Sequence, residues 1–64
     1  MNRLNERLEE LIDLFNLGEV VEGLAQVSRE KADHAWTNWQ DRKTAQGWDR
    51  VANKLEIVAS KIEV

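Results

Sequence analysis

The sequence predicts an all-α protein of three helices, the last two forming a long antiparallel helical hairpin. Apolar residues recur at steps of three and four, which is the spacing of one helix face. The chain has no Pro and only three Gly among its 64 residues, so few positions interrupt a helix. No short segment alternates apolar and polar residues as a half-buried strand does. These observations favour helices that pack on helices.

The first helix is expected over about residues 2–16. Its apolar stripe consists of Leu4, Leu8, Leu11, Ile12 and Phe15. Asn2 or Asn5 is the expected N-cap, because an Asn side chain accepts a hydrogen bond from a free amide at a helix start. Asn16 and Gly18 form the expected stop, since both residue types tolerate the left-handed conformation that closes a helix.

The second helix is expected over about residues 19–41. The middle of its stripe is made of small residues, namely Ala25, Ser28, Ala32 and Ala35. Small side chains let a facing helix come close, or leave room for large side chains from it. Gly23 weakens this helix, so either the helix begins after it or another element approaches its backbone closely.

The third helix is expected over about residues 44–63, with Thr44 as its N-cap. Its stripe is Trp48, Val51, Ala52, Leu55, Val58, Ala59 and Ile62. The polar connection Asp41–Thr44 is short, which makes the second and third helices antiparallel neighbours. A hairpin folded near residue 43 pairs Trp39 with Trp48 and Ala32 with Leu55. Large residues then meet small ones across the contact.

The chain is short enough to be a single domain over residues 1–64. The first helix covers only part of the apolar edge that the hairpin leaves exposed. We therefore expect a homo-oligomer, with a dimer favoured, in which two hairpins form a four-helix-type bundle. The first helices would be added outside this core or exchanged between partners.

Composition narrows the setting in which the protein works. The chain has no Cys, so it has neither a disulfide framework nor a thiolate zinc site, and the cytoplasm is the expected compartment. The first residues carry charges and do not resemble a signal peptide. No apolar run approaches the ~20 residues of a membrane span. The acidic polar face of the first helix also disfavours binding to a membrane surface.

The candidate site is a group of three tryptophans near the hairpin turn, Trp36, Trp39 and Trp48, together with Arg42 and Lys43. One interpretation is that the indoles are core residues that close the turn end, because they fall on the apolar stripes. The other is a binding patch for a protein, or a stacking platform for single-stranded nucleic acid. The net charge of −3 disfavours nucleic acid as a partner.

No segment carries a catalytic, cofactor or metal-binding motif. His34, the only histidine, follows Glu30 by one helical turn but lies off the apolar stripe, so it is expected at the surface without a metal. The mixed charges of the third helix also argue against a helix-turn-helix DNA-binding motif. The sequence therefore predicts a non-enzymatic structural or regulatory protein that acts through protein–protein contacts. The alternative is a nucleic-acid-binding module at the turn.

Overall fold

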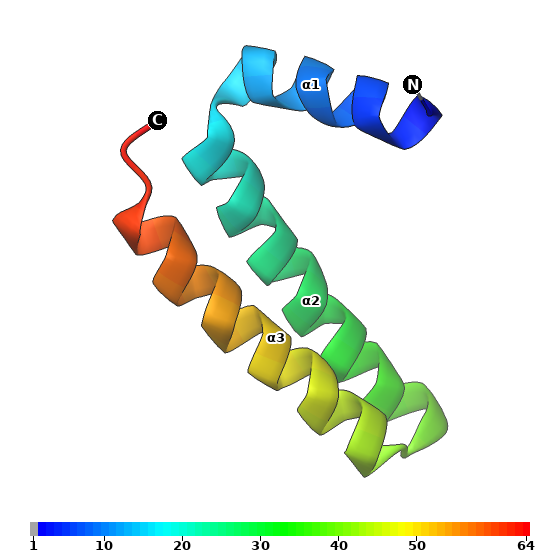
Figure 1. The fold of residues 1–64 in the computed structure, drawn as a ribbon. Coiled ribbons are helices and arrows are strands. Elements are labelled where there is room, and N and C mark those ends of the chain that lie inside the picture. The colour runs from blue at the N-terminus through cyan, green and yellow to red at the C-terminus, as the bar shows by residue number, and fades with distance from the viewer. Residues whose placement is uncertain (1) are drawn as a thin grey trace.

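The computed structural model describes residues 2–64, which form three helices: α1 (Arg3–Phe15), α2 (Leu17–Trp39) and α3 (Arg42–Lys61). Helices α2 and α3 lie side by side and antiparallel, whereas α1 projects from the start of α2 away from α3 (Figure 1). The all-α prediction and the hairpin of the last two helices are confirmed. None of these helices is both long enough and apolar enough to cross a membrane.

Asparagine side chains cap the first two helices. Asn2 Oδ1 accepts a hydrogen bond from the Asn5 amide at 2.8 Å, so Asn2 is the N-cap of α1. Asn16 ends α1 with a positive φ of 107°, and its Oδ1 accepts from the Glu19 amide at 2.9 Å. With ψ at 161°, Asn16 lies outside the left-handed helical region, and Gly18 lies inside α2. The helix does end before Asn16, but the expected left-handed stop at these two residues is wrong. One residue therefore separates the two helices, and α2 begins at Leu17 rather than at residue 19.

The hairpin turn is shorter and earlier than the sequence suggested. Gln40 adopts the left-handed conformation, with φ 50° and ψ 33°, and its amide bonds the Trp36 carbonyl at 3.1 Å. Asp41 is the N-cap of α3, because its carboxylate accepts from the Thr44 amide at 3.1 Å and from the Thr44 hydroxyl at 2.7 Å. The prediction of Thr44 as N-cap is wrong, and α3 begins two residues earlier than expected, at Arg42.

The early turn changes the register of the hairpin. At the open end of the hairpin, which lies opposite the turn, the Gly18 amide donates to the Val64 carbonyl at 3.0 Å. Near the turn, Ala32 lines a cavity together with Ala45 and Asp49. Asp49 precedes Leu55 by six residues, so the predicted pairing of Ala32 with Leu55 is wrong.

Small side chains form the contact between α2 and α3. The buried residues of the described chain are Ala25, Ser28, Ala32, Ala35, Ala45 and Ala52. Several of them are seven residues apart, which keeps them on one helix face and lets the two backbones approach. The Ser28 hydroxyl is satisfied, since it donates to the Leu24 carbonyl at 2.7 Å. No large side chain of residues 2–64 is fully buried.

At two glycines inside helices, nothing in the described chain explains why a residue with a side chain is absent. Gly23 lies well inside α2, and a Cβ added there would meet nothing within 4 Å. Both explanations that the sequence offered for Gly23 are therefore wrong for the described residues. Gly47, inside α3, has the same open surroundings.

Candidate interaction surface

One side of the hairpin is polar. On α2 and α3, residues at steps of three and four line two shared cavities on this side. We name this set the polar face: Glu22, Gln26, Arg29, Asp33, Trp36, Arg42, Gln46, Asp49, Asn53, Glu56 and Ser60. Within this face, Arg29 of α2 bridges to α3 by hydrogen bonds and ion pairs.

Arg29 is the centre of the polar face. Its Nε donates to Glu56 Oε1 at 2.9 Å, and its Nη2 donates to Asn53 Oδ1 at 2.8 Å. Asp49 lies farther away, with an N···O distance of 3.8 Å. The hydrogen bond with Glu56 raises the pKa of Arg29 and lowers the pKa of Glu56. Because the charged side chains are 41–57% exposed, these ion pairs contribute little to stability.

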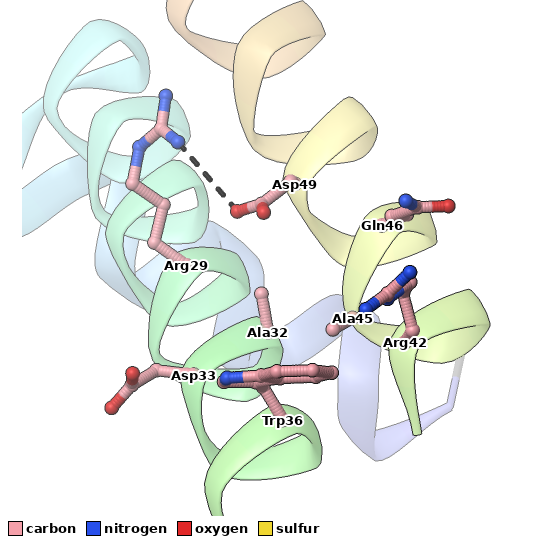
Figure 2. A pocket seen from close by; sticks show the side chains of 8 residues that line it. All are labelled: Arg29, Ala32, Asp33, Trp36, Arg42, Ala45, Gln46 and Asp49. Carbon is pink, nitrogen blue, oxygen red and sulfur yellow. Dashed lines mark ion pairs between the residues drawn. The ribbon is translucent and has the colours of Figure 1, made fainter. Parts of the chain in front are cut away.

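Two of the sequence-predicted site residues meet on the polar face near the turn. The Arg42 guanidinium lies over the Trp36 ring, 5.5 Å from its centroid. Figure 2 shows the two side chains beside Ala45, in an open cavity of about 450 Å³ that Arg29, Asp33 and Asp49 also line. An Arg above an aromatic ring is a cation–π contact. The cavity carries both signs of charge, so it offers no uniform attraction to an anion or a cation.

The other two tryptophans lie on a different cavity. Trp39 and Trp48 line a space of about 300 Å³ together with Lys31, His34 and Ala35. Trp39 and Trp48 thus border one cavity, whereas Trp36 lies on another. The predicted register that pairs Trp39 with Trp48 is wrong, because the turn falls at Gln40 and Asp41. Lys43 is exposed in the first turn of α3 and lines none of these cavities.

The three indoles are not core residues. Their exposed fractions are 49% for Trp36, 73% for Trp39 and 36% for Trp48. Within the described chain the indoles form no buried cluster at the turn, because the two helices meet through Ala and Ser.

The side of the hairpin opposite the polar face is apolar. It carries a second set of residues at steps of three and four, which we name the apolar face: Val20, Leu24, Val27, Trp48, Val51, Leu55, Val58 and Ile62. Most of these side chains are exposed, and the others are only half-buried. Lys31 is the one charged residue that follows the same spacing on α2. This row of exposed apolar side chains is the candidate interaction surface of the chain.

Helix α1 extends the apolar surface. It has no buried residue, and Leu4, Leu11, Ile12 and Phe15 of its stripe are exposed. Leu11 and Phe15 form an open groove of about 410 Å³ with Val20, Gly23 and Leu24 of α2. Helix α1 contacts α2 but not α3, and it lies on the side of α2 that faces away from α3 (Figure 1).

His34 lies at the surface beside the cavity that Trp39 and Trp48 line. His34 is exposed, as expected, and the Asn38 amide group lies 2.7 Å from its Nδ1. Among residues 2–64, no group of three or more His, Cys, Asp or Glu side chains is arranged to hold a metal ion.

Sequence reasoning missed the network around Arg29. The signal was present, because polar residues recur at steps of three and four on α2 and again on α3. The network could not be predicted without the correct register of the hairpin, because only that register places Arg29 of α2 opposite Asn53 and Glu56 of α3.

Comparison with known proteins adds no relative: no protein family, no curated protein and no solved structure matches this chain.

Proposed function

We propose that this chain is a small non-enzymatic structural or regulatory protein that acts through protein–protein contacts as a helical homo-oligomer, with a dimer favoured. The observation that supports the proposal is the exposed area. The chain exposes 5430 Å². A compact monomer of this mass exposes ~4,200 Å², so the excess is roughly 1,200 Å².

The excess exposed area is large enough to form an interface with a partner. A stable interface buries ~800 Å² on each partner, which is less than the excess. Hydrophobic stabilisation scales with the apolar area removed from water, and the α2–α3 contact removes little because its buried side chains are Ala and Ser. A second copy that covers the apolar face supplies the missing burial. Small domains without a metal or a disulfide commonly gain stability in this way.

A matched pair of substitutions tests the proposal. Val58 belongs to the apolar face, and its neighbour Ile57 is similarly exposed but lies off that face. We expect Val58→Asp to shift the protein toward monomer in light scattering, because a carboxylate in an apolar interface is left unpaired. Ile57→Asp should leave the mass unchanged. Equal behaviour of the two variants would contradict the apolar face as the site of assembly.

The second candidate is a nucleic-acid-binding module at the turn. The exposed Trp36 ring with Arg42 above it is the observation that favours it. Asp33 and Asp49 in the same cavity weaken it, since they repel phosphate. Binding of a single-stranded oligonucleotide that weakens steeply with added salt would support this candidate. Assembly through apolar surface lacks that salt dependence.

The compartment proposed for this function is the cytoplasm, because the chain has no Cys that would need an oxidising environment.

A further inference from the structure

The charges along the outer edges of the hairpin favour one arrangement of the two copies in a dimer. This inference rests on the proposed function, because it requires that the protein forms a dimer. Two hairpins that meet through their apolar faces have two simple two-fold arrangements. With the axis perpendicular to the helices, α2 lies on the partner's α2 and α3 on the partner's α3. With the axis parallel to the helices, α2 of each copy lies antiparallel to α3 of the other.

The outer edge of α3 is basic. Helical spacing puts Lys43, Arg50, Lys54 and Lys61 on the side of α3 that faces away from α2, and all four are exposed. None of them lines a cavity between the two helices. No acidic residue shares this edge within α3, because its two carboxylates, Asp49 and Glu56, lie on the polar face beside Arg29.

The outer edge of α2, which is the side that faces away from α3, carries an acidic residue near the middle of the helix. Glu30 is exposed and lies off both the polar face and the apolar face. It makes no hydrogen bond or ion pair among the described residues. Glu19, three turns earlier, is also exposed and lines the groove beside α1.

The register of the hairpin puts these opposite charges at matching heights. Arg29 reaches Asn53 and Glu56 on one side of α3, and Ala32 lies beside Asp49. Glu30 is therefore level with the stretch of α3 that contains Arg50 and Lys54. At the open end, Gly18 lies at the height of Ile62 and Val64, which puts Glu19 level with Lys61.

We propose that a second copy covers the apolar face with the two-fold axis parallel to the helices, so that Glu30 of each copy lies beside Arg50 and Lys54 of the other. The acidic edge of α2 then adjoins the basic edge of the partner's α3. The perpendicular axis instead sets the basic edges of the two α3 helices against each other. Like charges at an interface rim disfavour an arrangement, and opposite charges select it.

Charge reversal tests the arrangement. Glu30→Lys should weaken dimerisation by about tenfold or more, because each change puts like charges together twice in a two-fold dimer. Arg50→Glu should do the same. The combined Glu30→Lys/Arg50→Glu variant has the net charge of the parent and should regain its dimer affinity. Glu10→Lys, on the polar side of α1, changes the net charge as Glu30→Lys does and should have no effect.

Cysteine cross-linking gives a second readout, since the chain has no Cys of its own. A mixture of Leu24→Cys and Val58→Cys proteins should form a disulfide between chains under mild oxidation. Val27→Cys, near the middle of α2, should stay uncross-linked, because it meets its own copy only when the axis is perpendicular.

The outcomes separate this inference from the proposed function. A dimeric parent whose affinity is unchanged by Glu30→Lys, or a Val27→Cys dimer that cross-links to itself, overturns the arrangement and leaves homo-oligomer function standing. A parent that stays monomeric overturns both. Circular dichroism of each variant verifies that these exposed substitutions leave the helices formed.

Discussion

Arg29 on α2 donates from Nε to Glu56 Oε1 on α3 over 2.9 Å, and the same guanidinium reaches Asn53 Oδ1 at 2.8 Å. One side chain thus binds two residues a turn apart on the facing helix. The turn at Gln40 and Asp41 sets the register of the two helices, and this polar bridge is a specific side-chain contact made in that register.

The bridge predicts how stability depends on pH. The hydrogen bond with Arg29 lowers the pKa of Glu56, and hydrogen bonds from the Thr44 hydroxyl and amide lower the pKa of Asp41. A carboxylate with a lowered pKa stabilises the fold above its ordinary pKa, and this stabilisation is lost as the pH falls through the lowered value. We expect the melting temperature to stay flat near neutral pH and to fall below about pH 4.

Glu56→Gln provides the control for the pH dependence. This variant keeps a hydrogen-bond acceptor but has no titrating group at the position. Its melting temperature should be slightly lower at neutral pH and should fall less steeply on acidification than that of the parent. A parent that becomes more stable between pH 4 and pH 3 would contradict the sign of both shifts.

Enlarging a buried alanine should open the hairpin. Ala32 is 4% exposed in the α2–α3 contact, so Ala32→Leu should cost ~1–3 kcal/mol of unfolding free energy by overpacking. Thr37→Leu, at an exposed position of the same helix, should be close to neutral. Urea titrations followed by circular dichroism measure both. A neutral Ala32→Leu variant would mean that the helices are not in close contact there.

Both helix-interior glycines should be replaceable. An added methyl group meets nothing within 4 Å at Gly23 or at Gly47, so alanine at either position should gain ~0.5–1 kcal/mol through helix propensity. Thermal melts at one protein concentration compare the two variants. If Gly47→Ala stabilises and Gly23→Ala destabilises, another chain approaches α2 at Gly23, and the region beside α1 is part of the interface.

The tryptophans should differ according to the face on which they lie. Trp48 belongs to the apolar face, whereas Trp36 lies on the polar face under Arg42. Trp48→Ala should weaken dimerisation, and Trp36→Ala should leave it unchanged. Neither substitution should lower the unfolding free energy of the single chain by the ~3–5 kcal/mol that truncation of a buried tryptophan costs. Melts at two protein concentrations separate the two effects, and equal losses in both variants would contradict the division into faces.

The sequence predicted the three helices because periodicity and caps are local properties. Asn2 was one of two candidates for the first N-cap, Asn16 was one of two residues expected to end the first helix, and the Ala stripe of α2 does face α3. The register could not be predicted in the same way. It depends on Gln40, which adopts a left-handed conformation that its residue type does not favour, and on Asp41 capping ahead of Thr44.

The tryptophan site was misjudged for a related reason. Spacing placed the three indoles near the apolar stripes, but a helix stripe is broad, and only the direct contact side is buried. Once Ala32 and Ala35 occupy that side, Trp36 is left to one side of the contact and Trp39 and Trp48 to the other. The spacing of apolar residues identifies a helix face, whereas the sizes of the side chains decide which part of that face packs against the other helix.

Sedimentation equilibrium of the parent protein tests the central claim most directly. Measured across a wide range of protein concentrations, the mass should approach twice the 7.4 kDa of the chain and should fall toward one chain only on dilution. The melting temperature should rise with concentration in parallel, because association stabilises the folded state by mass action. A well-folded species of one chain mass, with a melting temperature independent of concentration, would contradict the account.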